Sequence, residues 1–144
     1  MAAPVIARSS ALFVTEVTAG PHRWILDEPR EAGGTDLGPT PYDMLAAALA
    51  GCTAMTLHFY ARREKLQLAE VAVRVTHDRQ HAKDCADCTT TGGFIHRMRV
   101  DISLSGPLSA EEASHLLTVA GRCPVARTLT SEIRVEHALV SSVE

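Results

Sequence analysis

Four cysteines are the residues of this chain best suited to chemistry: Cys52, Cys123 and the closely spaced Cys85 and Cys88. A thiolate is a nucleophile and a metal ligand, and two neighbouring thiols can be oxidised to a disulfide. Cys52 lies within the apolar stretch DMLAAALAGCTAMTLHFY, residues 43–60. There it is either a small core residue or a reactive thiol, and the sequence pattern alone leaves both interpretations open.

Cys123 directly precedes Pro124, and proline favours the first position of a helix. Cys123 is therefore predicted to occupy the N-cap, where free backbone N–H groups and the helix dipole favour a thiolate. Arg122 and Arg127 add positive charge if their side chains fold back toward the sulfur. The alternative is a cysteine that merely caps the helix. A disulfide with Cys52 requires Cα atoms within about 7 Å of each other, which the sequence does not determine.

Cys85 and Cys88 belong to the segment HDRQHAKDCADC, which also contains His77 and His81. Cys-x2-Cys is a spacing that zinc sites use, and two histidines could complete a tetrahedral set of ligands. The same cysteines could instead form a redox-active pair in a mobile loop, or have no chemical role. The sequence leaves these three possibilities open.

The first elements that must position these thiols are short strands. Residues 5–17 have partial strand character, and RWILDEP indicates a second strand that Pro29 ends. A glycine-rich loop, REAGGTDLGP, follows. Asp27 and Glu28 could be interface or site residues, but we interpret them as ordinary acids at the end of a strand.

A long helix is then predicted over about 41–65, with Thr40 as N-cap, Pro41 at its first position and Asp43 as the capping-box acid. Gly51 in mid-helix costs about 1 kcal/mol relative to alanine, so a second helix or a substrate is expected to approach the backbone there. One apolar stripe at helical spacing predicts a central, mostly enclosed helix. The stripe consists of Leu45, Ala48, Leu49, Cys52, Met55 and Phe59.

The second half of the chain alternates strands and helices. AEVAVRVTH and FIHRMRVDISLSG have the alternation of two long strands, joined by the loop that carries Cys85 and Cys88. A helix with Ser109 as N-cap and Glu112 in its capping box follows, and then a short helix from Pro124. EIRVEHALV predicts a last strand over 132–140. The order β-β-α-β-β-α-α-β indicates one α+β domain spanning residues 1–144.

Composition narrows the function classes. The 144 residues are 46% apolar and 22% charged with a net charge of −3, and no long basic run points to nucleic acid. The N-terminus is a poor signal peptide, and the longest apolar run is shorter than the ~20 residues of a membrane span. The expected location is the cytosol, without membrane contact. Cytosolic cysteines are more often redox, metal or core residues than structural disulfides.

The stretches GGTDLGPTPYDMLAAALAGCTAMTLHFYARREKL and AGRCPVARTL resemble the OsmC/Ohr family of thiol peroxidases, over about residues 24–140, and are most similar to its YhfA-like branch. The resemblance implies an OsmC-like α+β fold with curved antiparallel sheets, a long central helix and an intertwined homodimer. It also implies that Cys52 attacks an organic hydroperoxide and becomes a sulfenic acid, with which Cys123 condenses to a disulfide. A lipoyl-type dithiol would reduce that disulfide, and no bound cofactor or metal is implied.

The sequence departs from the family pattern at several positions. The peroxidases carry NPE at the start of the helix, whereas this chain has TPY, with Tyr42 in the place of the acid and Asp43 one position later. In the peroxidases an arginine held by a glutamate activates the helix cysteine, and neither Arg23 nor Arg30 is a clear counterpart of it. Ala126 stands where the YhfA-like branch has histidine. A second interpretation is therefore a non-catalytic OsmC-like protein that binds thiols or small ligands. A third is an accessory module stabilised by a zinc-binding Cys-x2-Cys loop.

Overall fold

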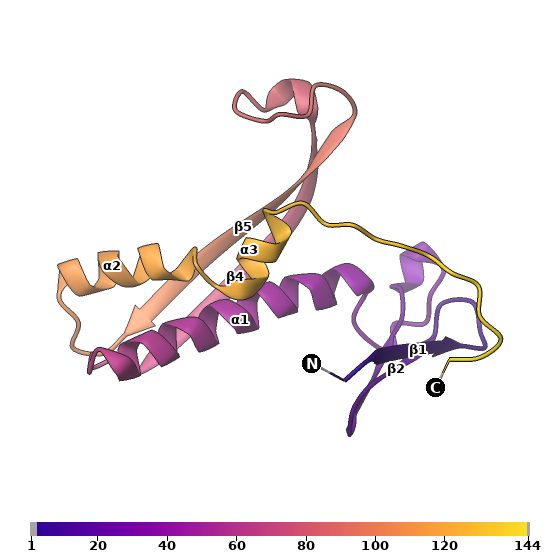
Figure 1. Cartoon of the computed structure of the whole chain (residues 1–144), viewed down its shortest axis with the longest axis horizontal. Coiled ribbons are helices and arrows are strands. Elements are labelled where there is room, and N and C mark those ends of the chain that lie inside the picture. Colours follow the sequence, from indigo (N-terminus) through magenta and orange to yellow (C-terminus); the bar gives the residue numbers. More distant parts are fainter. Residues whose placement is uncertain (1–2, 144) are drawn as a thin grey trace. The chain divides into compact units, whose positions relative to one another are not determined.

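The computed structural model describes residues 3–143, and Figure 1 labels most of its helices and strands. The chain divides into two compact units. The first comprises the segment up to Leu45 together with the segment from Arg134 onward, and the second comprises Ala46–Ile133. Helix α1, Pro41–Arg63, begins in the first unit and continues into the second. Each unit is described by itself below.

The first unit contains a three-stranded antiparallel sheet in the order β1-β2-β3. Its strands are β1 (Val5–Ser9), β2 (Thr15–Ala19) and β3 (His22–Leu26). The single strand expected over residues 5–17 is thus two strands separated by a turn. The Ser9 hydroxyl stabilises this turn by contacting the carbonyl oxygens of Ala11 at 2.6 Å and Val14 at 3.2 Å. Such local side-chain bonds compete with the continuation of a strand.

Asp27, which the sequence suggested to be an ordinary strand-end acid, organises the loop after β3. Its side chain is only 2% exposed. Oδ1 accepts from the Glu28 backbone at 2.8 Å, and Oδ2 accepts from the Thr35 hydroxyl at 2.5 Å and from the Thr35 and Leu37 backbones at 3.1 Å each. The loop packs tightly, because a Cβ at Gly34 would lie 1.9 Å from the Glu28 carbonyl oxygen. The short helix η1 (Arg30–Ala32) lies within this loop.

This arrangement predicts an acid-sensitive contribution to stability. The Thr35 hydroxyl and the backbone N–H groups lower the pKa of Asp27 from 3.8 to about 2, although burial acts in the opposite direction. The contribution is present above the unfolded pKa and is lost as the pH falls through the folded pKa. We therefore expect Asp27→Asn to lower the Tm at pH 7 by roughly 5 °C. The difference in Tm between Asp27→Asn and the wild type should shrink as the pH falls from about 4 to about 2.

Thermal unfolding followed by circular dichroism from pH 2 to 7 measures this effect. Glu28→Gln is the matched control, since it removes the neighbouring charge without breaking the Asp27 hydrogen bonds. Equal Tm values for Asp27→Asn and Glu28→Gln at pH 7 would contradict the assigned role.

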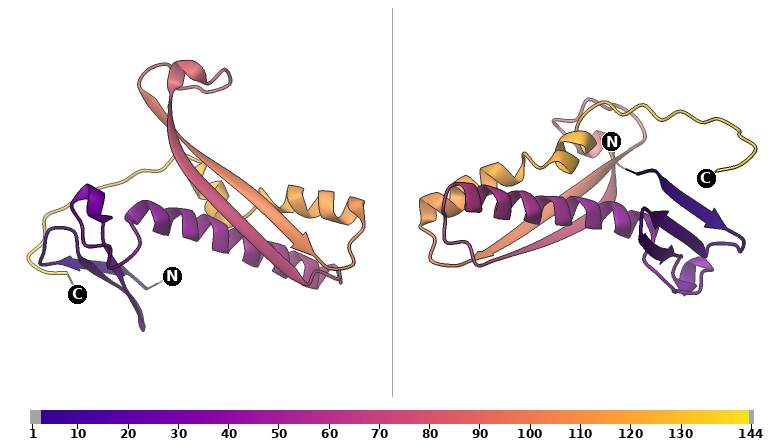
Figure 2. Two further views of the ribbon diagram at one scale, coloured as in Figure 1. Left: turned by 180° about the vertical axis from the view of Figure 1, so that it is seen from behind. Right: turned by 60° about the horizontal axis from the view of Figure 1, so that its bottom comes forward.

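The second unit packs helices on one face of a long antiparallel hairpin, as Figures 1 and 2 show. The hairpin consists of β4 (Glu70–His81) and β5 (Phe94–Ser105), and the helices are α1, α2 (Ala110–Ala120) and α3 (Pro124–Leu129). The loop between the strands includes the short helix η2 (Ala82–Asp84). Leu57 of α1 and Leu116 of α2, both 0% exposed, form the centre of the core. Inward side chains of the hairpin pack against it, namely Val71, Ile102 and Leu104.

Helix α1 begins as predicted, but it is buried on a different face. The Thr40 hydroxyl accepts from the Asp43 backbone at 3.1 Å and donates to the Asp43 carboxylate at 2.8 Å, forming a reciprocal cap. The helix ends at Arg63 rather than near the predicted residue 65. Lys65 adopts a positive φ, which an α-helix does not continue through. The prediction of a buried stripe through Met55 and Phe59 was wrong for the single chain, because these side chains are 74% and 70% exposed. The buried positions are Leu49, Thr53, Leu57 and Ala61.

The error has a physical reason, which is that α1 is apolar on nearly every side. A helix of this kind has no single hydrophobic stripe from which the packed face can be read. Among the described residues, α1 is also the one helix long and apolar enough to cross a membrane by length and composition. Core helices share this property, and the Leu57 face of α1 packs against α2 and the hairpin.

The strand predicted over residues 132–140 was also wrong. Residues 132–140 form neither helix nor strand in the structure, and apolar side chains such as Val135 and Leu139 are exposed. Alternation marks a segment that can join a sheet, but a strand forms only beside a partner strand. No described strand of this chain pairs with the segment. The remaining order is a mixed α+β fold with antiparallel sheets and one long helix, as expected.

Candidate functional site

Cys123 lies at the N-cap of α3, as the Cys-Pro pair predicted. Its side chain is 0% exposed, and Sγ accepts a hydrogen bond from the Ala126 backbone N–H at 3.3 Å. Pro124 begins the helix, and the Cys123 carbonyl accepts from the Arg127 backbone at 3.1 Å. The sulfur therefore receives one of the free N–H groups of the helix start. The side chains of Arg122 and Arg127 are exposed, and neither donates a hydrogen bond to this sulfur in the described chain.

Thr53 connects this sulfur to α1, and sequence reasoning missed it. Thr53 is only 2% exposed, and its hydroxyl lies 2.8 Å from the Leu49 carbonyl oxygen and 3.6 Å from Cys123 Sγ. A hydroxyl has one proton but can also accept. The Cys123 thiol can therefore donate to Oγ1 while the Thr53 proton stays with Leu49. The signal in the sequence was a lone threonine among apolar residues spaced four apart, from Leu49 to Ala61.

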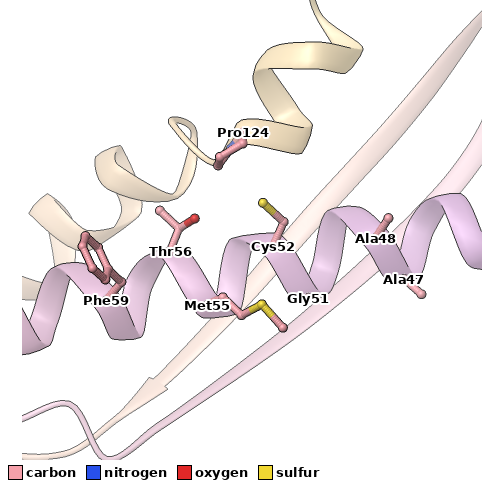
Figure 3. Close-up of a pocket in the computed structure, with 8 residues that line it drawn as sticks. All are labelled: Ala47, Ala48, Gly51, Cys52, Met55, Thr56, Phe59 and Pro124. Carbon is pink, nitrogen blue, oxygen red and sulfur yellow. The ribbon is translucent and has the colours of Figure 1, made fainter. Parts of the chain in front are cut away.

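Cys52, the neighbour of Thr53 along α1, is half-buried and lines an open cavity. Its side chain points toward Pro124, the residue that follows Cys123 (Figure 3). The cavity has a volume of about 670 Å³, and its lining contains no charged side chain of the described chain. The lining residues are Ala47, Ala48, Gly51, Cys52, Met55, Thr56, Phe59 and Pro124.

The two thiols predicted from the sequence thus lie on the same helix contact, between α1 and the start of α3. Cys123 contacts Thr53, the residue after Cys52, and Pro124, the residue after Cys123, lines the same cavity as Cys52. Both are free thiols in this structure. Cys52 faces the cavity, whereas Cys123 is enclosed. Such an arrangement can expose one sulfur to a small molecule while holding the second sulfur behind it.

Gly51 also lines the cavity, but the close neighbour expected there does not come from this chain. A Cβ at Gly51 would meet no described atom within 4 Å. The space beside the glycine is open in the described chain, so the expected neighbour, a second helix or a substrate, stays a prediction. A substrate or a second chain can still occupy that space.

Comparison with known proteins identifies the family. The family model described as OsmC-like protein matches residues 33–138, which include both Cys52 and Cys123. The chain belongs to the OsmC-like family. The match does not distinguish the YhfA-like branch from the others. No curated protein is significantly similar to this OsmC-like chain in sequence.

Solved structures share the fold of this OsmC-like protein. An OsmC-like protein from Mycoplasma pneumoniae has a TM-score of 0.69 at 21% identity, with 88% of this chain and 86% of that chain covered. An organic hydroperoxide resistance protein OsmC from Legionella pneumophila has a TM-score of 0.65 at 23% identity, covering 88% of each chain. OhrB of Bacillus subtilis, an organic hydroperoxide resistance protein, has a TM-score of 0.62 at 22% identity, covering 90% of this chain and 91% of that chain.

The arginines considered as activating residues of an OsmC-like peroxidase both belong to the first unit. Arg23, on β3, lies 3.6 Å from the Glu16 carboxylate in an exposed ion pair. Arg30 begins η1 and is exposed. An exposed pair of this kind stabilises a fold only weakly, by about 0–1 kcal/mol.

The zinc set proposed for this OsmC-like protein does not come together as four residues. Cys85 and Cys88 are joined by a disulfide in the loop between β4 and β5. His77 instead stacks on His96, with Nε2 and Nδ1 2.9 Å apart, and the His81 ring lies 4.2 Å from that of Phe94. Among the described residues, the side chains whose donor atoms lie close enough to share an ion are Cys85, Asp87 and Cys88, and neither histidine belongs to this group.

Proposed function

We propose that this OsmC-like protein is a cysteine-based enzyme that reduces organic hydroperoxides through Cys52 and Cys123. The Cys52 thiolate attacks the terminal peroxide oxygen, the O–O bond breaks, and the leaving alkoxide takes a proton to become an alcohol. Cys52 is then a sulfenic acid. The Cys123 thiol condenses with it, forming a disulfide and releasing water. A lipoyl-type dithiol returns two electrons and two protons by thiol–disulfide exchange.

The observation that carries this proposal is the contrast in access between two thiols on one helix contact. Cys52 faces an open apolar cavity of about 670 Å³, whereas Cys123 is 0% exposed behind Pro124. The N-cap makes Cys123 the sulfur with the more favourable surroundings for negative charge. A peroxide molecule nevertheless reaches Cys52 first, so access favours Cys52 as the nucleophile and Cys123 as the resolving thiol. An apolar lining suits an alkyl or aryl hydroperoxide.

The family context supports the same chemistry. The Legionella and Bacillus proteins that share this fold are named as organic hydroperoxide resistance proteins, and the former also as a predicted redox protein. A free-thiol redox cycle suits the reducing cytosol, which is the location we propose.

We further propose that the two units act as one OsmC-like domain within a homodimer. Met55 and Phe59 leave a large apolar face of α1 exposed, with 74% and 70% exposure. The alternating segment 132–140 also lacks a strand partner in the described chain. Exposed apolar patches and unpaired strand-like segments are typical of surfaces that associate. A second copy of the chain can cover both features.

A coupled assay tests the enzyme. Wild-type protein with dihydrolipoamide and cumene hydroperoxide is expected to consume dithiol at a rate at least about ten times that of the protein-free mixture. Linoleic hydroperoxide tests a longer apolar substrate, and hydrogen peroxide is the polar comparison. Absence of turnover with all three, from protein whose thiols titrate as free, would contradict the proposal.

One observation favours a second candidate function, a non-catalytic protein that binds thiols or small ligands. The described residues that line the cavity carry no charge, so one chain alone supplies no arginine to activate a peroxide there. This candidate predicts that an apolar ligand binds in the cavity and protects Cys52 from alkylation, while no peroxide turns over. Alkylation of Cys52 with and without cumyl alcohol, measured by mass spectrometry, detects binding, and protection without turnover in the coupled assay favours this candidate.

A further inference from the structure

The loop between β4 and β5 contains a pair of cysteines that the proposed peroxide chemistry does not use. Cys85 and Cys88 form a disulfide across three positions of sequence, and both are half-buried. The loop lies beyond the helices, at the far end of the hairpin from α2 (Figures 1 and 2). A reductant in solution can therefore reach this disulfide. In a reducing cytosol the pair is expected to spend time as two thiols.

A third possible metal ligand, the carboxylate of Asp87, lies beside the disulfide. Sγ of Cys85, Sγ of Cys88 and a carboxylate oxygen of Asp87 all lie within 4.8 Å of one another. Asp87 Oδ1 is 3.7 Å from Cys85 Sγ. A disulfide sulfur has no proton, so this contact is not a hydrogen bond. It places two possible metal ligands close to each other. Once the disulfide is reduced, two thiolates and a carboxylate are three ligands of the types that tetrahedral zinc sites use.

The surroundings leave room for a bound ion and its fourth ligand. Cys85, Asp87 and Cys88 line an open cavity of about 590 Å³, which Asp84 and His96 also line. Asp84 adds negative charge beside the cluster, whereas Arg97, also in the lining, opposes a cation. The fourth position can therefore be taken by water or by a nearby donor. Thiolate ligands select soft or borderline cations over Mg²⁺ and Ca²⁺.

We propose that Cys85, Asp87 and Cys88 form a redox-controlled site for a thiophilic divalent cation such as Zn²⁺. A dithiol reductant opens the disulfide by supplying two electrons and two protons, and is itself oxidised to a disulfide. Both thiols lose their protons when the cation binds. A small-molecule disulfide oxidant takes up the two electrons by thiol–disulfide exchange and, with two protons from solvent, becomes two thiols. The Cys85–Cys88 disulfide that forms no longer supplies two thiolate ligands, and the ion is released. The site is separate from Cys52 and Cys123, and the proposal does not depend on peroxide turnover.

Zinc binding by the full-length protein tests the proposal. Protein reduced with a phosphine, or left oxidised, is titrated with Zn²⁺ against a chromophoric chelator, and retained zinc is measured by mass spectrometry. The reduced wild type is expected to bind about one Zn²⁺ per chain, and the oxidised wild type almost none. Asp87→Asn is expected to weaken binding by about tenfold, since it replaces an anionic ligand with a neutral one.

Two matched double variants locate the ion. The variant C85S/C88S should lose the zinc, whereas C52S/C123S should keep it, which separates this site from the proposed catalytic thiols. Alkylation of the wild type provides a readout that needs no variant, because Zn²⁺ should protect Cys85 and Cys88 from iodoacetamide. Less than about half a zinc per reduced chain, or equal zinc in C85S/C88S and the wild type, would overturn the proposal.

Discussion

Cys52→Ser is expected to reduce peroxide consumption at least about 1,000-fold, to the background rate, because a serine hydroxyl is not ionised at neutral pH and is a poor nucleophile toward peroxide oxygen. Cys123→Ser is expected to behave differently. It should still consume one equivalent of cumene hydroperoxide and then accumulate a sulfenic acid on Cys52, because no second thiol is present to condense with it. Dimedone labelling followed by peptide mass spectrometry identifies the modified cysteine.

The two variants form a matched pair, since each removes one sulfur from the same helix contact. Cys123→Ser replaces an enclosed side chain that lies 3.6 Å from Thr53 Oγ1 and 3.3 Å from the Ala126 nitrogen. A hydroxyl is smaller than a thiol and can leave a gap in the packing, so the Tm of Cys123→Ser should be compared with the Tm of the wild type. If Cys52→Ser still consumes peroxide and forms a sulfenic acid while Cys123→Ser does not, the two roles are reversed. If both variants retain full turnover, the thiols are not the reactive groups.

The parts of the site that could be predicted from the sequence are those fixed by local rules. The reciprocal cap between Thr40 and Asp43 and the capping box of α2 depend on residues three apart, and both formed as expected. The N-cap position of Cys123 depends only on the proline that follows it. Strand alternation likewise identified the two long strands β4 and β5, since the side chains of a strand alternate between its two faces. These features need no knowledge of distant contacts.

The features that the sequence did not reveal depend on long-range partners. Thr53 became part of the site because α3 brings a residue 70 positions later to its hydroxyl. Asp27 became a loop organiser because Thr35 and Leu37 fold back onto its carboxylate. A pattern of apolar residues cannot say which side of an apolar helix meets the rest of its own chain. The exposed face of α1 and the unpaired segment 132–140 raise the same question, which is what lies against them.

The second large effect concerns that exposed face. Phe59 projects from α1 with 70% exposure, one turn beyond Met55 along the cavity lining. If a second copy covers this face, Phe59→Glu buries a carboxylate without a partner. Removing a hot-spot side chain near the centre of an interface costs about 2 kcal/mol or more. We therefore expect Phe59→Glu to weaken self-association at least about 30-fold, with little change in the Tm of the monomer.

Light scattering after gel filtration, over a hundredfold range of concentration, measures this association. The measured mass of the wild type should be twice the chain mass of 15.5 kDa, and the measured mass of Phe59→Glu should equal the mass of one chain. Leu117→Glu is the control, because Leu117 of α2 is 61% exposed but does not line the cavity. A monomeric wild type would rule out the homodimer, and a dimeric Phe59→Glu would show that another surface forms it.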